Sequence, residues 1–444
     1  MRRVNHKLFA WVCSPLLIVS VALGLRLVWL FDHAPWYDDY RRLITDAPNP
    51  DTGSYHEVAL VLLRYWNKPG QALVEMPEAT LSIIIRAPGY PLIMAILYAL
   101  FGVKPVWIVI VQVFASVFNC YLVILALRRI SSPVGASVGG WLFALNPMLI
   151  DYTQMILTET LFVLGATLII YLFAGFRSLP SPNFPRAGFG IGIVVALATL
   201  IRPSPLWLIP VFGIFGILAR TLSAKARALW LVGYLIGVLA LFLPWSVYNR
   251  VHYGSWRLTV AGELFLLDVT GQVLVKRQKP IHEMRAVLEA EAFALMRKDG
   301  LDPNRDIFER GRYYRAVSLQ YIRQHLGDFA YYTLRGMFFF WRGTGEPPKT
   351  GGRWINVSSP VVELWYKAYY LTYIVALGVG LWFSWGAKQQ RWWVALFAVT
   401  TLYFMLSAGC LAYPRFRLQA FAFSLPVIAI GLDTVRQRLN PRAA

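Results

Sequence analysis

The sequence predicts an all-α polytopic membrane protein, and three observations support this fold class. Hydrophobic residues make up 57% of the 444 residues, and the mean hydropathy is +0.51. One soluble core could not bury that much apolar surface. The apolar residues also fall into long runs, and the basic residues stand largely at the ends of those runs, where they orient membrane helices.

Ten apolar runs predict ten full membrane spans. The first run, 8–30, follows Arg2, Arg3 and Lys7. It is too long for a signal-peptide core and lacks a small-x-small cleavage site, which predicts an uncleaved span with its amino end in the cytoplasm. The remaining runs lie near 105–127, 134–150, 155–176, 188–202, 204–219, 228–249, 360–384, 392–412 and 416–433. An eleventh stretch, 88–101, is too short for a full crossing, because a helix rises about 1.5 Å per residue and a hydrocarbon core is about 30 Å thick.

With 88–101 left out of the full spans, the charged residues divide between the two sides of the membrane. The predicted cytoplasmic side carries basic groups at Arg128 and Arg129, Arg177 and Arg186, Arg220, Lys225 and Arg227, Lys388 and Arg391, and Arg436 and Arg438. The opposite side carries the loop 32–87, the 151–159 segment, the long 250–359 segment, and Arg415 with Arg417. This division follows the positive-inside rule, so both termini are expected in the cytoplasm and the unusual polar groups outside the cytoplasmic (inner) membrane.

Net charge and cysteine placement argue against two other classes of protein. The formal net charge of +20 does not indicate nucleic-acid binding, because no basic face with base-stacking aromatic residues stands apart from the membrane runs. The three cysteines, Cys13, Cys120 and Cys410, all lie inside apolar runs. They are expected to be small core residues, with neither a disulfide framework nor a zinc site.

The chain is expected to have three parts: a membrane module at 1–249 that includes the outer loop 32–87, a non-cytoplasmic helical segment at 250–359, and carboxy-terminal membrane helices at 360–444. The middle part shows helical spacing of apolar residues over 286–296. A second helix is expected after Asp302-Pro303-Asn304 and onward to 338–341, with basic and aromatic residues interleaved as in interfacial helices. These helices could form a lid on the bundle or contact the substrate directly.

Several carboxylates lie beside the predicted spans, where a charge is costly unless it is hydrated or paired. Asp38, Asp39 and Asp51 lie in the outer loop, and Glu159 starts an otherwise apolar span. A functional role competes with a structural one at each position. Asp51 could cap a helix that begins at Thr52, and Asp38 with Asp39 could be the solvated end of the first span. Glu159 could form an interhelical hydrogen bond to a Tyr, Thr or Arg.

The glycines of Gly188-Phe-Gly190-Ile-Gly192 do not indicate a nucleotide-binding loop. The segment lacks the full spacing, follows no predicted strand and opens a membrane span. Small residues at such a place let helices pack closely.

The order of short motifs resembles the GT-C superfamily of membrane glycosyltransferases, specifically the bacterial branch related to protein mannosyltransferases and lipid A aminoarabinose transferases, which is glycosyltransferase family 39-like. The resemblance covers most of the chain. It rests on Asp51 with Ser54-Tyr55 and Ala59; Arg86-Ala-Pro-Gly-Tyr-Pro91 before a run that ends at Phe101-Gly102; Asn146-Pro147 with Thr158-Glu159-Thr160; Arg202-Pro203; Leu243-Pro-Trp245 with Tyr248-Asn249 and Tyr253-Gly254; and Tyr413-Pro-Arg415-Phe-Arg417. It implies a GT-C-type bundle of about 10–11 transmembrane helices with periplasmic juxtamembrane helices, and a catalytic module within 1–249.

The resemblance also implies an inverting transferase that moves a sugar from a polyprenyl-phosphate donor to a lipid, glycan or protein acceptor of the envelope, with the active site facing the periplasm or exterior. Asp51 is then the candidate base, because an acceptor hydroxyl must lose its proton as it attacks. Tyr55, one helical turn on, would hold the carboxylate or stack on a sugar. A single displacement needs one base opposite the leaving group and no covalent enzyme intermediate.

Four arginines are the candidates for the lipid phosphate, whose developing negative charge guanidinium groups stabilise. Arg86 is the first candidate, and Arg202, Arg415 and Arg417 could join it or could snorkel to lipid headgroups. No cofactor or metal is expected. Relatives linked to metal binding carry a carboxylate just before the basic residue, where this chain has Ile85.

Two alternatives share part of this pattern. A polytopic transporter or lipid flippase would also place buried charge among about ten helices, but it predicts substrate-binding charges near the bilayer midplane and related halves of the chain. A non-catalytic relative in an envelope-assembly complex would keep the fold without requiring Asp51.

Overall fold

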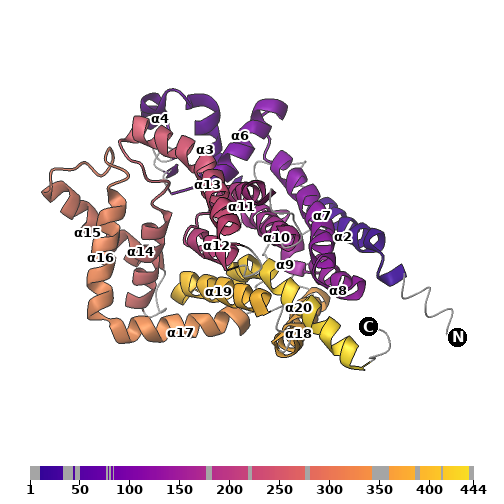
Figure 1. Ribbon diagram of the computed structural model, residues 1–444. Helices are drawn as coiled ribbons and strands as arrows, with labels where there is room; N and C mark the ends of the chain where they lie inside the picture. Colours follow the sequence, from indigo (N-terminus) through magenta and orange to yellow (C-terminus); the bar gives the residue numbers. More distant parts are fainter. Residues whose placement is uncertain are drawn as a thin grey trace.

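The computed structural model is built from helices that form a bundle with a smaller lobe beside it (Figure 1). The structure describes residues 11–33, 44–45, 51–76, 79, 82–83, 85–176, 183–218, 223–275, 281–342, 360–385, 391–411 and 414–439. Throughout these ranges the regular elements are helical. The first part contains α2 (Pro15–His33), α3 (Asp51–Tyr65), α4 (Pro69–Glu75), α6 (Gly89–Phe101), α7 (Val106–Arg128), α8 (Pro133–Ala144), α9 (Pro147–Tyr152), α10 (Glu159–Phe176), α11 (Phe184–Ile201), α12 (Leu208–Ile217) and α13 (Ala224–Tyr253).

Each of the ten predicted apolar runs contains a helix, but the helices differ in length. Among the described residues, six helices are long and apolar enough to cross a membrane: α2, α7, α11, α13, α19 (Arg391–Ala408) and α20 (Arg417–Leu439). Shorter apolar helices occupy Gly89–Phe101, Glu159–Gly175 and Leu208–Ile217. With 13 residues, α6 is about 20 Å long at 1.5 Å per residue. That length agrees with the expectation that 88–101 does not cross completely.

The predicted run 134–150 is interrupted, so it forms two helices in place of one. The first of them, α8, ends at Ala144, and α9 begins at Pro147. Asn146 caps α9, because its side chain accepts a hydrogen bond from the Leu149 amide at 3.2 Å. Proline is favoured at the first position of a helix but cannot continue one, since it lacks an amide hydrogen.

The last helix, α20, lies at the centre of the bundle. Its residues 417–431 are all buried, and it packs against α8, α10, α18 (Pro360–Ser384) and α19. The outer helices show the opposite pattern. On α13, Val232, Leu235, Ile236 and Leu239 are each between 47% and 56% exposed. Apolar side chains that point outward are expected where lipid, and not water, surrounds a protein.

The α11–α13 contact depends on glycines. A Cβ atom added at Gly188 or Gly192 of α11 would lie 2.1 or 2.2 Å from a backbone oxygen of α13. The same holds in the other direction. A Cβ atom added at Gly233 or Gly237 of α13 would lie 2.1 or 2.3 Å from a backbone oxygen of α11. The interpretation of Gly188 and Gly192 as packing residues is therefore confirmed, whereas Gly190 faces open space.

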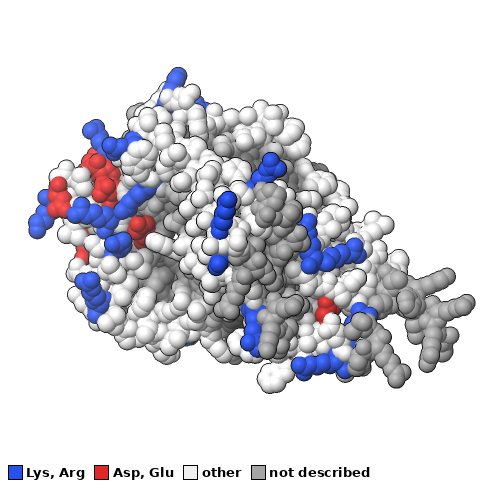
Figure 2. All heavy atoms as spheres, in the orientation of Figure 1, with Lys and Arg blue, Asp and Glu red and all other residues white. Residues whose placement is uncertain are grey.

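The segment that follows α13 forms the lobe at the left of Figure 1, with α14 (Ala261–Leu274), α15 (Ile281–Lys298), α16 (Arg310–Gln324) and α17 (Leu326–Arg342). Its own apolar cluster joins α14, α15 and α16 through residues such as Leu267, Leu288 and Val317. On the face shown in Figure 2, acidic side chains gather with basic ones at the left, over this lobe. Two short 3₁₀ turns, η3 (Gly409–Leu411) and η4 (Pro414–Phe416), lead into α20.

Two expectations about this lobe need correction. The helix expected from Asp302–Asn304 to 338–341 is two helices, because the backbone of His325 leaves the helical region at φ −125° and ψ 36° and separates α16 from α17. The other correction concerns α14, which has no counterpart among the predicted helices. The helix expected over 286–296 lies within α15.

Candidate active site

Three segments that are distant in sequence meet at Asp51. This residue is the first of α3, Arg86 precedes α6, and Arg415 lies in the turn η4 before α20. One oxygen of the Asp51 carboxylate is 2.7 Å from Nη2 of Arg86, and the other is 3.3 Å from Nη1 and Nη2 of Arg415. The candidate base and two of the candidate phosphate ligands therefore form one ion-paired group.

Arg86 is held in place from several sides. Its Nε donates a hydrogen bond to Ser54 Oγ at 3.2 Å, and its guanidinium carbon lies 4.9 Å from the centre of the Tyr55 ring. Tyr55 is 7% exposed and packs edge-on against Tyr90, whose hydroxyl donates to Gln112 at 2.8 Å. The Tyr55 ring therefore packs against the Arg86 guanidinium group and helps to hold it in place. A ring so deeply buried offers little surface for stacking on a sugar.

A second ion pair lies beside the first. Nη1 of Arg202 is 2.9 Å from Glu159 and 2.8 Å from the hydroxyl of Thr158. When the Gln419 amide is oriented to satisfy both its neighbours, its oxygen accepts from Nε and Nη2 of Arg202, each at 2.9 Å. The ring of Phe416 contacts both ion pairs, because the guanidinium carbons of Arg202 and Arg415 each lie 5.5 Å from its centre. Glu159 thus pairs with an arginine of the next helix, which is one of the structural roles expected for it.

We call Asp51, Arg86, Glu159, Arg202 and Arg415 the arginine cluster. Counted as ionised, its three guanidinium groups and two carboxylates leave one positive charge. Burial acts to raise the pKa of the Asp51 carboxyl, but the charges of Arg86 and then Arg415 outweigh it and lower the pKa to about 2. Asp51 is therefore an anion at every pH above about 4, because the group titrates within roughly two units of its pKa.

The structure places other predicted residues away from the cluster. Arg417 is 2% exposed, and its guanidinium carbon lies 4.0 Å from the centre of the Tyr370 ring of α18. Asp38 and Asp39 lie outside the described residues, and so does Tyr413. Among the described residues, no three His, Cys, Asp or Glu side chains come together as a metal site would require.

Asp268 of α14 is a charged neighbour that the sequence pattern does not indicate. Burial raises the pKa of its carboxyl to about 6, against the lowering effect of Arg285 at 3.5 Å, and the charges of Asp51 and Arg86 also act on it. Phe265, one helical turn earlier on α14, packs edge-on against Phe416 with ring centres 6.0 Å apart. One face of α14 is thus directed toward the arginine cluster.

The chain just before α14 is also attached to the cluster. The hydroxyl of Thr259 donates to the carbonyl oxygen of Ile85 at 3.3 Å, directly beside Arg86. The Ile85 side chain packs against the apolar cluster of the lobe. The lobe and the site therefore form a continuous structure.

Comparison with known proteins adds a family match and a similar fold. Residues 85–248 match the family model described as dolichyl-phosphate-mannose-protein mannosyltransferase. Among solved structures, an oligosaccharyltransferase of Archaeoglobus fulgidus, tethered with an acceptor peptide, has a TM-score of 0.51 and 13% sequence identity. The similarity covers 96% of this chain and 50% of that one, so this chain spans about half the length of the oligosaccharyltransferase.

Two further structures are more distant. ArnT of Cupriavidus metallidurans bound to undecaprenyl phosphate has a TM-score of 0.38 at 15% identity, with 97% of this chain and 79% of that chain covered. The same protein in the apo state has a TM-score of 0.36 at 15% identity, with 97% and 78% covered. No curated protein sequence matches this chain.

Proposed function

We propose that this chain, a membrane protein of the GT-C superfamily, transfers a sugar from a polyprenyl-phosphate-linked donor to an acceptor at the outer face of the cytoplasmic membrane. The observation that carries the proposal is the Asp51 carboxylate between Arg86 and Arg415. The family match at 85–248 begins next to one of these arginines and includes Glu159 and Arg202.

The positive charge of the arginine cluster suits the phosphate of the donor. Arg86 and Arg415 point their guanidinium groups at one carboxylate, and a phosphate offers the same kind of oxygen with more negative charge. When the donor binds, its phosphate can therefore take over these N–H groups from Asp51. The guanidinium groups then stabilise the charge that develops as the phosphate leaves.

Release from the arginines would also make Asp51 a better base, because nearby positive charge is what lowers its pKa. The acceptor hydroxyl attacks the anomeric carbon and gives its proton to the carboxylate as the new bond forms. The bond between the anomeric carbon and the phosphate oxygen breaks, and polyprenyl phosphate leaves with the electron pair. Ser54, Tyr55 and the Glu159–Arg202 pair act as positioning groups in this scheme.

The position of the charges also bears on the transporter or flippase alternative. Asp51 and Glu159 are the first residues of α3 and α10, Arg202 follows the end of α11, and Arg415 precedes α20. These charges stand at helix ends, where a reaction at one membrane face would need them. A transporter site would be expected near the middle of the spans.

The test is Asp51→Asn in purified protein, with transfer and donor binding measured separately. Asn keeps the shape of Asp51 and begins a helix about as well, but it cannot accept a proton. We expect transfer to fall by a factor of about 10² to 10⁴, the usual contribution of a positioned general base. Donor affinity should stay equal or rise, because the variant leaves Arg86 and Arg415 free for the phosphate.

Asp38→Asn and Asp39→Asn serve as controls in the same assay, since both residues are the alternative acids of the outer loop. Both variants should transfer normally. Near-normal turnover in Asp51→Asn, together with a loss in one of these two, would move the catalytic role to that residue. Weaker donor binding in Asp51→Asn would contradict the exchange of arginine partners.

A further inference from the structure

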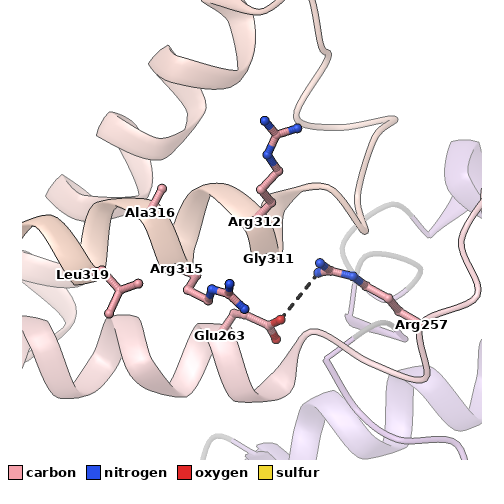
Figure 3. A pocket seen from close by; sticks show the side chains of 7 residues that line it. All are labelled: Arg257, Glu263, Gly311, Arg312, Arg315, Ala316 and Leu319. Atoms are coloured by element: carbon pink, nitrogen blue, oxygen red, sulfur yellow. Dashed lines mark hydrogen bonds and ion pairs between the residues drawn. The ribbon is translucent and has the colours of Figure 1, made fainter.

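A pocket of about 310 Å³ lies in the lobe, between the loop before α14, the first turn of α14, and α16 (Figure 3). It is lined by Arg257, Glu263, Gly311, Arg312, Arg315, Ala316 and Leu319. Three arginines and one glutamate give these walls two positive charges in excess. None of these residues belongs to the arginine cluster.

The arginines of the pocket are available to a ligand. In Figure 3 the guanidinium groups of Arg257 and Arg315 point toward Glu263, whereas Arg312 points away from it. The Arg257–Glu263 pair is long, at 3.5 Å, and its side chains are 42% and 25% exposed. A pair of this kind is held weakly, because water competes for both partners. A group with more negative charge than one carboxylate can therefore recruit these arginines.

Gly311 of α16 leaves room for the guanidinium group of Arg257. Gly311 of α16 is buried, and a Cβ atom added there would lie 2.8 Å from Nη1 of Arg257 and 3.1 Å from Cγ1 of Val260. A methyl group at position 311 would therefore displace the end of the Arg257 side chain. Gly262, at the start of α14, has no atom within 4 Å of the corresponding position.

The pocket is connected to the arginine cluster by a short stretch of chain. Arg257 is two residues before Thr259, whose hydroxyl bonds the carbonyl of Ile85, and Arg86 follows Ile85. The loop that supplies one wall of the pocket is therefore attached to the segment that supplies a wall of the site. One hydrogen bond and two short stretches of chain thus join the pocket to the candidate site.

We propose that this pocket binds a phosphoryl group on the acceptor, so that the acceptors of this protein are phosphorylated molecules; this identification rests on the proposed transfer reaction. The volume is at the lower end of the roughly 300–1,000 Å³ typical of ligand pockets. It is about ten times the roughly 30 Å³ that one water molecule takes up in the liquid, so the pocket is larger than one small group requires. The sugar or glycerol unit that carries the phosphate would therefore fit with it.

Protection of individual arginines from phenylglyoxal, read by mass spectrometry, tests binding without any transfer reaction. The full-length protein is placed in nanodiscs of neutral phosphatidylcholine and labelled with and without inorganic pyrophosphate. A probe at ten times its dissociation constant should slow labelling of Arg257 and Arg315 about elevenfold, the factor 1 + [L]/Kd. Arg305, 83% exposed on the same lobe, is the internal control and should label at an unchanged rate.

Two glycine variants make the test specific to the geometry. Gly311→Ala displaces the end of the Arg257 side chain and should reduce the protection of Arg257, whereas Gly262→Ala adds the same methyl group in open space and should leave the protection unchanged. Equal labelling of Arg257 and Arg315 with and without pyrophosphate would overturn the proposal. So would equal protection of Arg305, because it would show general screening of charge.

Two further experiments distinguish a lipid headgroup from a dissolved molecule as the carrier of the phosphoryl group, and binding in the pocket from the transfer reaction. Protection in nanodiscs of anionic phosphatidylglycerol, without added pyrophosphate, would identify a lipid headgroup as the carrier. Protection by pyrophosphate alone would favour a phosphorylated acceptor that approaches from solution. Protection that persists in the Asp51→Asn protein would support phosphoryl binding in the pocket even if the protein shows no transfer activity. The two proposals can therefore fail separately.

Discussion

Asp51 and Asp268 are two carboxylates that both interact with the charge of Arg86, and their surroundings move their pKa values in opposite directions. Asp51 contacts both Arg86 and Arg415, which lowers its pKa to about 2 against the effect of burial. Asp268 has one arginine partner, Arg285, at 3.5 Å, so burial prevails and raises its pKa to about 6. Direct contact with charge, more than depth in the protein, decides the sign.

The raised pKa of Asp268 predicts that Asp268→Asn stabilises the protein at neutral pH. Between pH 3.8 and about 6 the folded state binds more protons at Asp268 than the unfolded state does. The carboxyl therefore lowers the free energy of unfolding as the pH rises through this window. Above it, Asn should raise that free energy by on the order of 1–3 kcal/mol, at 1.36 kcal/mol per pKa unit.

Thermal unfolding in detergent at pH 4 and pH 8 measures this effect. The difference between wild type and Asp268→Asn should be large at pH 8 and small at pH 4, where the carboxyl is protonated in the folded state and partly protonated in the unfolded state. Loss of the contact with Arg285 offsets little, since both side chains are 22% or more exposed. A less stable Asp268→Asn protein at pH 8 would show instead that the Arg285 pair dominates.

The sequence predicted some of the residues of the candidate site. Asp51, Arg86 and Arg415 each belong to a short motif, and the structure brings them together. Arg417 could not be separated from Arg415 by sequence, yet the two residues are two positions apart and so point in different directions. Asp268 was missed because no helix was predicted at 261–274, and only the fold brings this segment near the arginine cluster.

The helices that the sequence predicts best are those with a strong local signal. Long apolar runs gave α7 and α13, and a charged amphipathic pattern gave α15. The helix α14 contains Gly262, Gly271 and several β-branched residues, which are poor helix formers. It is held by the burial of Leu264 and Leu267 against the lobe, a tertiary effect that local propensity does not reveal.

The packing of α11 on α13 yields a prediction with a matched control. Gly192→Ala would place a methyl group 2.2 Å from the Tyr234 carbonyl oxygen, which forces the two helices apart. Overpacking of this kind typically costs about 1–3 kcal/mol of stability. Gly190→Ala faces open space two residues earlier and should be neutral or stabilising, because Ala favours a helix by roughly 0.5–1 kcal/mol over Gly.

The melting temperatures of both variants in the same detergent test whether α11 and α13 need close glycine packing. A lower melting temperature for Gly192→Ala alone supports close glycine packing. Equal melting temperatures for both would mean that α11 and α13 can separate at no cost.

In the molecule as a whole, the charged side chains of the candidate site lie at helix ends. Asp51, Glu159, Arg202 and Arg415 stand at the ends of four helices and meet in one cluster. From the alternation of spans the sequence predicted that Asp51, Glu159 and Arg415 lie on one side of the membrane, but not that they lie in contact. It could not show that α8 ends at Ala144 within the predicted run 134–150, since the length of a helix depends on where caps and prolines interrupt a run.

The side of the membrane on which the cluster lies is the last prediction. The positive-inside rule places Arg128, Lys225 and Arg438 in the cytoplasm and the lobe outside. Single cysteines at these exposed positions and at Arg305, in a protein whose native cysteines are replaced, should divide between the two sides when a membrane-impermeant thiol reagent is applied to intact cells. Only the cysteine at 305 should react before lysis, and all four should react after it. Reaction of both cysteines, at 128 and at 305, before lysis would contradict the topology. The end of α7 and the lobe would then lie on the same side of the membrane.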